Sequence, residues 1–209
     1  ISMKNLGKLK ESEEYLSKAI KLNPDMYESK KNLSVLLKQK EILHQINLAR
    51  KSKVENKTDF IQNKILLLNP FISKRLVEPE LIDNIYKIDS VDLDTTSDVR
   101  FGNGICSDYE LFKNKSPIIK NVAEDLTNII KQAVQSDVYI IESFFNIWRQ
   151  GSGIKTHTHL THFDEIYGLN KKKYSLTYYL AIGDQRCSEP GILKLQDPDK
   201  EILPSEGTI

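Results

Sequence analysis

The chain has 209 residues, of which 39% are hydrophobic and 28% charged, and its formal net charge is +1. This composition supports a folded core in one or two domains. No apolar run is long enough to cross a bilayer, and the lysine-rich N-terminus does not have the form of a secretory signal, so we expect a cytoplasmic protein without a membrane partner.

The distribution of charge and the cysteine content indicate which partners and which redox state to expect. Residues 1–57 contain 13 Lys and Arg against 7 Asp and Glu, whereas residues 58–209 contain 17 against 22. The basic part carries no nucleic-acid-binding motif, so we interpret it as a solvated helical face and expect no nucleic-acid partner. Cys106 and Cys187 are far apart in sequence, and we expect reduced thiols rather than a disulfide.

Two amphipathic helices are predicted near the N-terminus. The first covers residues 9–21 and the second residues 26–40, with a break at Asn23-Pro24-Asp25. Their expected apolar stripes are Leu9, Leu16, Ala19 and Ile20 in the first helix and Leu33, Leu36 and Leu37 in the second.

The spacing of small and helix-breaking residues within residues 5–40 resembles a tetratricopeptide repeat. Gly7 corresponds to the turn between the paired helices, Ala19 to the small packing residue of the second helix and Pro24 to the break between repeats. An ordinary helical hairpin is the alternative. The resemblance implies that residues 1–57 are a helical segment with its linker, that they bind a protein or peptide partner, and that further repeats precede them.

The middle of the chain mixes helices and loops. Residues 41–58 are expected to continue the second helix into a linker, residues 60–70 form an apolar run, and residues 89–115 are rich in loop-forming residues. Two helices have clear start signals: Pro79 suits a first helical turn, and Ser116-Pro117 combines an N-cap with a proline at the first helical position. The expected buried stripe of the second of these helices is Ile118, Val122, Leu126, Ile129, Ile130 and Val134.

Beyond Asp137 the pattern changes to that of β-strands. Residues 138–148 and 174–182 are rich in β-branched and aromatic side chains, and residues 191–196 form a third candidate strand after a Pro-Gly turn. Helices followed by short strands predict an α+β fold with a β-sandwich or barrel at its C-terminal end.

Three of the four histidines lie in the run His157-Thr-His159-Leu-Thr-His162-Phe-Asp164. On a strand, His157 and His159 would point to the same face with Cα atoms about 6.5 Å apart, so both imidazoles can bind one metal ion. Asp164 is the expected third ligand, because two histidines and one carboxylate are typical of non-haem Fe(II). His162 with Asp164 is the alternative pair, and exposed loop histidines are the alternative to a metal site.

The order of the motifs after Phe144 resembles the C-terminal domain of the Fe(II)- and 2-oxoglutarate-dependent dioxygenases of the prolyl-hydroxylase-like kind. The matching pieces are G-x-x-x-H-T-H (153–159), Y-S-L-T-Y-Y-L (174–180), E-P-G-I-L-K-L-Q-D-P (189–198) and L-P-S-E-G-T-I (203–209). The resemblance implies that residues 58–209 form an incomplete double-stranded β-helix, or jelly roll, with flanking helices. It also implies an Fe(II) ion and a 2-oxoglutarate co-substrate.

The second of these motifs carries the candidate co-substrate residues. In the family, the strand after the histidine pair lines the 2-oxoglutarate pocket. Tyr174, Thr177 and Tyr179 are expected to alternate on one face of this strand and to line that pocket. Ordinary core packing is the alternative for these side chains.

Two features depart from the family pattern. The family's first ligand pair is usually His-x-Asp, whereas this chain has His157-x-His159. The family's distal histidine and the basic residue that binds the 2-oxoglutarate carboxylate follow a strand that begins here at Gly207, so we expect both to lie beyond Ile209. The sequence therefore predicts a hydroxylase fragment that is inactive by itself, and no motif identifies its substrate.

Two other functions fit parts of the sequence. The spacing from Gly151 through the histidine pair to Asp164 resembles the first cupin motif, with Asp in place of Glu. Cupins share the double-stranded β-helix but not the chemistry. The other alternative is a non-enzymatic interaction module built on the tetratricopeptide-like helices. A structural zinc site is disfavoured, because neither cysteine lies near the histidine run.

Overall fold

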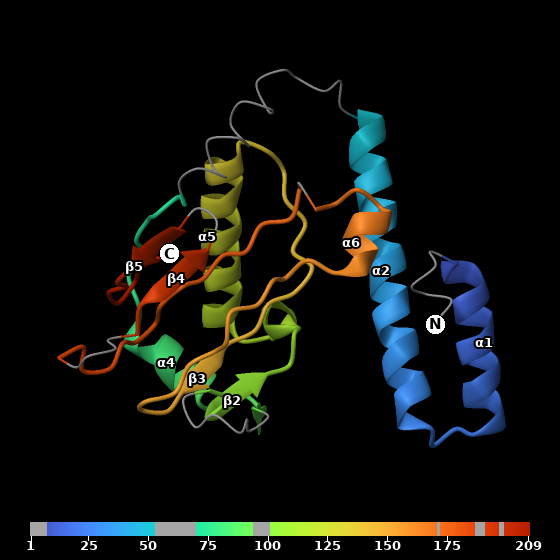
Figure 1. The fold of residues 1–209 in the computed structure, drawn as a ribbon, viewed down its shortest axis with the longest axis horizontal. Coiled ribbons are helices and arrows are strands. Elements are labelled where there is room, and N and C mark those ends of the chain that lie inside the picture. The colour runs from blue at the N-terminus through green and yellow to red at the C-terminus, as the bar shows by residue number, and fades with distance from the viewer. Residues whose placement is uncertain (1–7, 53–69, 94–100, 171, 187–190, 197–198) are drawn as a thin grey trace. The chain divides into compact units, whose positions relative to one another are not determined.

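The structure is a computed structural model that describes residues 8–52, 70–93, 101–170, 172–186, 191–196 and 199–209. It is a mixed α+β protein with helices at its N-terminal end and small antiparallel sheets (Figure 1). Two compact units are present: residues 1–55 with 157–175, and residues 56–156 with 176–209. No helix in the described ranges is long and apolar enough to cross a membrane.

The first unit contains the predicted helix pair as α1 (Leu9–Leu22) and α2 (Tyr27–Ser52). Between them, the backbone N–H of Asp25 donates to Oδ1 of Asn23 at 3.2 Å, which closes the turn around Pro24. An ion pair between Lys40 and Glu13 links the two helices. As predicted, α2 continues past residue 40, and it ends at Ser52. The rest of the predicted linker and most of the apolar run at 60–70 lie outside the described residues.

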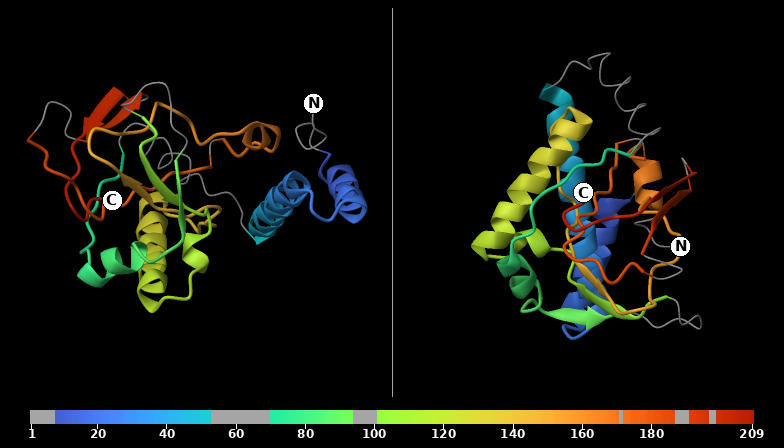
Figure 2. Two further views of the ribbon diagram at one scale, coloured as in Figure 1. Left: turned by 90° about the horizontal axis from the view of Figure 1, so that it is seen from below. Right: turned by 90° about the vertical axis from the view of Figure 1, so that its left-hand side faces the viewer.

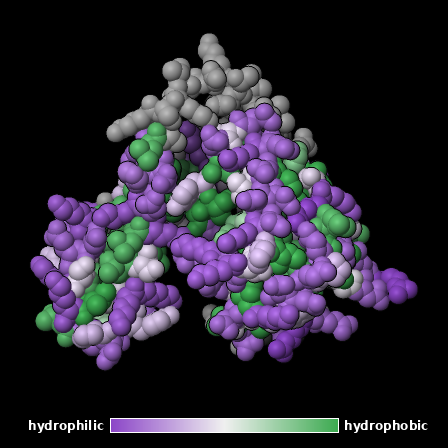
Figure 3. Space-filling view, turned by 180° about the vertical axis from the view of Figure 1, so that it is seen from behind, coloured by the Kyte–Doolittle hydropathy of each residue, from purple (hydrophilic) through white to green (hydrophobic). Residues whose placement is uncertain are grey.

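The predicted apolar stripe of α2 is only partly right. Leu36 is completely buried and Leu33 is half-buried, but Leu37 is 47% exposed. Adjacent helical residues are separated by about 100° around the axis, so Leu37 points away from the side on which Leu36 is buried. Figure 3 shows a stripe of apolar surface along the hairpin.

The second unit confirms both helix starts in the middle of the chain, with α4 at Pro79–Ile85 and α5 at Pro117–Val134. Its strands form a three-stranded antiparallel sheet of β1 (Ser90–Asp92), β2 (Gly104–Ser107) and β3 (Asn146–Trp148), and a β4 (Leu193–Gln196) and β5 (Asp199–Ile202) hairpin. A short 3₁₀ helix, η2, covers Leu111–Lys113. The two further views in Figure 2 show α5 as the long helix of this unit.

Three strand predictions need correction. Residues 89–115, expected to be loop, supply β1 and β2, whereas residues 138–148 form a strand only at β3. Ahead of β3, the hydroxyl of Ser107 accepts the Phe145 N–H at 3.1 Å and that of Ser143 accepts the Phe112 N–H at 2.9 Å. These side-chain bonds interrupt the backbone ladder, although the Ser107 N–H still donates to Phe145 O at 3.1 Å, and composition alone does not reveal them.

The third correction concerns residues 174–182, which are extended but form no regular strand. The predicted third strand, by contrast, is present as β4. Tyr179 nevertheless pairs with the C-terminal segment: its N–H donates to Thr208 O at 2.9 Å and its carbonyl accepts the Gly207 N–H at 2.8 Å. On its other side, Thr208 forms an antiparallel bridge with Lys74.

The core of the second unit gathers around α5. Its buried members are Leu81, Ile85, Leu111, Ile119, Val122, Leu126 and Phe145. The expected stripe of α5 is thus shifted, because Ile119 is 1% exposed while Ile118 and Ile129 only border the core. Ser116 precedes the helix as predicted, but its hydroxyl donates to Asn84 Oδ1 at 3.1 Å rather than capping the helix. Cys106 is a buried free thiol, and Cys187 lies outside the described residues.

Candidate functional site

His157 and His159 lie on an exposed, irregular stretch of the first unit. The predicted strand is absent here, because a local turn intervenes: the Leu160 N–H donates to Thr158 Oγ1 at 3.1 Å. The two imidazole rings are still neighbours, with centroids 4.9 Å apart and an edge-to-face angle of 68°. The structure therefore places the rings of the two favoured histidines side by side, on an irregular segment rather than on a strand.

His162 has a different partner. It is the first residue of the short helix α6 (His162–Ile166), and its Nδ1 lies 3.1 Å from Oε2 of Glu165. Both side chains are well exposed. His162 is therefore engaged with the next turn of its own helix rather than with Asp164, the partner expected in the alternative metal pair.

Helix α6 is closed at both ends by recognisable capping motifs. At the start, Thr161 and Asp164 form a capping box, in which the Thr161 N–H donates to Asp164 Oδ2 at 2.7 Å. At the end, Gly168 has a φ of 65°, its N–H donates to Glu165 O at 3.2 Å, and the Leu169 N–H donates to Asp164 O at 2.7 Å. This is the Schellman pattern, in which a glycine in the left-handed region reverses the chain.

Asp164 is buried, with 3% of its surface exposed, and its Oδ2 has three donors. These are the Thr161 N–H, the Thr161 hydroxyl at 2.8 Å and Lys173 Nζ at 2.9 Å. Burial raises the pKa of Asp164, but the bonds from Lys173 and Thr161 outweigh it and leave this pKa below its ordinary value. The side chain is therefore an ionised anchor inside the protein.

These contacts decide how well the residues fit an iron ion. The imidazoles of His157 and His159 are suitable donors placed side by side. Oδ2 of Asp164 does not fit as a third ligand in this arrangement, because three hydrogen-bond donors surround it. Within the described parts of the chain, no three His, Cys, Asp or Glu side chains lie close enough to hold a metal ion. The three-ligand site stays a prediction.

The candidate co-substrate residues do not share one strand face. The alternating residues Leu176, Tyr178 and Leu180 pack against the core of the second unit, so Thr177 and Tyr179 alternate with core positions. Thr177 is exposed, whereas burial raises the pKa of the half-buried Tyr179. Tyr174 belongs to the first unit and is 37% exposed. A role in co-substrate binding stays a prediction for all three.

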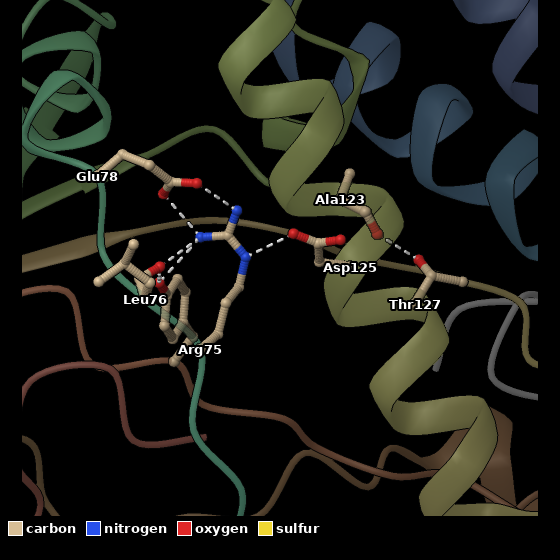
Figure 4. A network of polar contacts seen from close by, with 7 residues as sticks. Arg75, Leu76, Glu78, Ala123, Asp125 and Thr127 are labelled. Atoms are coloured by element: carbon tan, nitrogen blue, oxygen red, sulfur yellow. Dashed lines mark hydrogen bonds and ion pairs between the residues drawn. The ribbon is translucent and has the colours of Figure 1, made fainter.

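The second unit contains a polar cluster around Arg75 that the sequence did not predict. The guanidinium of Arg75 donates to both Glu78 oxygens at 2.7 and 2.8 Å, and to Asp125 Oδ2 at 2.8 Å (Figure 4). It also contacts Tyr178, whose hydroxyl accepts at 3.1 Å from Arg75 and donates at 2.9 Å to Leu76 O.

This cluster joins segments that are far apart in the chain. The Arg75 side chain is only 9% exposed, and its donors are directed at a carboxylate before α4 and another on α5. A guanidinium in that position is a structural tie between the two helices. The ion pair between Arg75 and Glu78 could have been predicted, because the two residues are three positions apart. The contacts with Asp125 and Tyr178 could not, because these residues are distant in sequence.

Comparison with known proteins gives no relative. No protein-family model, no curated protein and no solved structure was found to match the chain.

Proposed function

We propose that this chain belongs to an Fe(II)- and 2-oxoglutarate-dependent oxygenase and that His157 and His159 are two of its metal ligands. The observation that carries the proposal is the neighbouring pair of imidazole rings, with centroids 4.9 Å apart, on an exposed segment. Asp164 is not included among the proposed ligands, because its Oδ2 already accepts hydrogen bonds from Thr161 and Lys173. Fe(II) with 2-oxoglutarate and O2 supplies the oxidising power for hydroxylation of a C–H bond.

The pairing at the C-terminal end gives additional support. The resemblance places the co-substrate strand at residues 174–180 and the strand that leads to the distal histidine at Gly207. In the second unit, the backbone N–H of Gly207 donates to the carbonyl oxygen of Tyr179 at 2.8 Å. Pairing between these two segments is compatible with the jelly roll that the resemblance implies. We accordingly include that fold for residues 58–209, and a tetratricopeptide-like unit for residues 1–57, in the proposal.

A metal titration tests the ligand assignment. Co(II) is a suitable probe, because its visible spectrum reports nitrogen ligation directly. We expect a Co(II) spectrum with the 209-residue chain, its loss in the His157→Ala/His159→Ala variant, and its retention in His44→Ala. His44 is the matched control, since it is an exposed histidine on α2 of the same unit. An unchanged spectrum in the double variant would refute the assignment.

The same sample separates the oxygenase from a cupin-like metal protein. Addition of 2-oxoglutarate should change the Co(II) spectrum of an oxygenase, because the co-substrate binds the metal directly. A spectrum that responds to 2-oxoglutarate would therefore favour the oxygenase over the cupin-like alternative.

A second candidate function is favoured by the surface of the helical hairpin. Its exposed apolar side chains are Tyr15, Leu22, Met26, Tyr27, Val35, Leu37 and Leu48. Apolar side chains concentrated on a helical hairpin are typical of a surface that binds a protein or peptide. If the wild-type chain and the double histidine variant take up equally little Co(II), the interaction module becomes the preferred function.

A further inference from the structure

Lys173 connects the histidine pair to α6. Its Nζ donates to the backbone oxygen of His159 at 2.6 Å and to Oδ2 of Asp164 at 2.9 Å. The contact is largely shielded from water, since the side chains of Lys173 and Asp164 are 19% and 4% exposed. An ammonium group held between a backbone oxygen and a buried carboxylate fixes the distance between them.

Turns after α6 bring Lys173 back to Asp164. The turn at Gly168 reverses the backbone after α6, and a further hydrogen bond of 2.9 Å from the Lys172 N–H to Leu169 O continues the reversal. The Thr161 cap holds Asp164 from the opposite end of the helix. Lys173 therefore approaches a carboxylate whose position is already fixed.

The donors around Asp164 also oppose a metal at the same oxygen. A carboxylate oxygen has about two lone pairs, and Oδ2 is already approached by the three donors from Thr161 and Lys173. One of these donors is a cation, which repels a metal ion at close range. A metal at this oxygen would have to displace Lys173 and release the His159 backbone.

We propose that Asp164 and Lys173 form a clasp that positions His159 beside His157, and that Asp164 is not a metal ligand. The clasp consists of Thr161, Asp164 and Lys173 and acts on the backbone of His159. Its effect on metal affinity rests on the proposed function, whereas its effect on the histidine pair does not. Lys173 is thus a positioning residue for the metal-binding segment.

Lys173→Met should change the Co(II) affinity in opposite directions, depending on whether Asp164 is part of the clasp or a metal ligand. With a clasp, the variant loosens His159, and Co(II) affinity falls about 10- to 100-fold, the usual effect of losing a residue that orients a ligand. Lys173→Arg, which can still donate to both oxygens, should restore most of it. If Asp164 were a ligand, loss of Lys173 would free its carboxylate, so an unchanged or higher affinity overturns the proposal. Lys10→Met, at an exposed position of α1 in the same unit, is the charge control.

Asp164→Asn provides the second test and keeps an acceptor oxygen for Thr161 and Lys173. The clasp predicts that the nuclear Overhauser contact between the rings of His157 and His159 and most of the Co(II) affinity persist. Loss of Co(II) binding with the ring contact intact would identify Asp164 as a ligand and refute the proposal.

The ring contact also separates this inference from the proposed function, because it is measured without metal. If the wild-type chain binds no Co(II), the proposed function fails, yet the clasp still predicts that Lys173→Met weakens the contact and accelerates amide exchange at residues 157–160. Should both readouts stay unchanged in Lys173→Met, the clasp itself is wrong.

Discussion

Gly207 lies directly against the backbone of Arg75. The Arg75 N–H donates to Gly207 O at 2.9 Å, and a Cβ at position 207 would stand 2.4 Å from the carbonyl oxygen of Arg75. Gly207 also has a φ of 78°, a conformation that side chains disfavour. Two independent requirements therefore reserve this position for glycine, and they place the C-terminal segment beside the residue that ties α4 to α5.

Gly207→Ala should lower the free energy of unfolding by about 3 kcal/mol, because it adds backbone strain of about 1–2 kcal/mol to a steric clash. Two control variants separate these causes. Gly151→Ala has the same kind of backbone, with a φ of 73° and open space around its Cβ, and should show the strain alone. Gly183→Ala has open space and no positive φ, so it should be nearly neutral. Urea unfolding measures all three, and equal effects at 207 and 151 would contradict the close approach to Arg75.

Arg75→Met should destabilise the second unit by about 2 kcal/mol or more at pH 7, because it leaves Glu78 without its charged donors. Lys113→Met is the control. It removes an ion pair with Glu110 in which both partners are well exposed, and such pairs contribute little.

The effect of Arg75→Met should also depend on pH. The hydrogen bonds from Arg75 outweigh burial and lower the pKa of Glu78 below its ordinary value of 4.5. A lowered pKa in the folded state stabilises the protein above about pH 4.5 and loses this effect as the pH falls through the folded pKa. The stability difference between wild type and variant should therefore shrink in acid. Urea midpoints at pH 7 and at decreasing pH measure it, and a difference that grows in acid would reverse the assigned sign.

Cys106 should react slowly with thiol reagents while the protein is folded. The side chain is 5% exposed, and burial raises the pKa of its thiol, which reduces the reactive thiolate. In a Cys187→Ser variant, which leaves Cys106 as the remaining cysteine, we expect slow labelling in buffer and rapid labelling in urea. Equally fast labelling in both conditions would show that the sheet around β2, its central strand, opens readily.

Local signals made part of the fold predictable. Pro24, Pro79 and the Ser116-Pro117 pair mark helix boundaries through the conformational limits of proline, and those boundaries are confirmed. Strands were predicted less well, since hydroxyl groups such as that of Ser107 interrupt the backbone ladder through long-range contacts that composition does not encode. The closeness of Arg75 to Asp125 and Tyr178 likewise depends on tertiary packing.

The candidate site was predictable to a similar extent. Clustering of His157 and His159 was enough to expect neighbouring rings, and their rings do lie together. The role of Asp164 in capping α6 could have been predicted from the sequence. Thr161 and Asp164 have the spacing of a capping box, and Gly168 lies where a glycine ends a helix. Lys173 carries no local signal. Its contact with Asp164 depends on the path that the chain takes after Gly168, which the sequence does not indicate.

The neighbouring residues Leu36 and Leu37 offer a last test, this time of the helical hairpin. Leu36 is fully buried, and truncation of a buried leucine to alanine costs about 2–5 kcal/mol, so Leu36→Ala should destabilise the first unit strongly. Leu37 has the same side chain and helical environment but is 47% exposed, and Leu37→Ala should cost well under half as much. Amide exchange within α1 measures the hairpin separately from the second unit. Comparable losses of protection in the two variants would mean that Leu37 is covered in solution, as expected if the exposed apolar side chains of the hairpin bind a partner or a second copy of the chain.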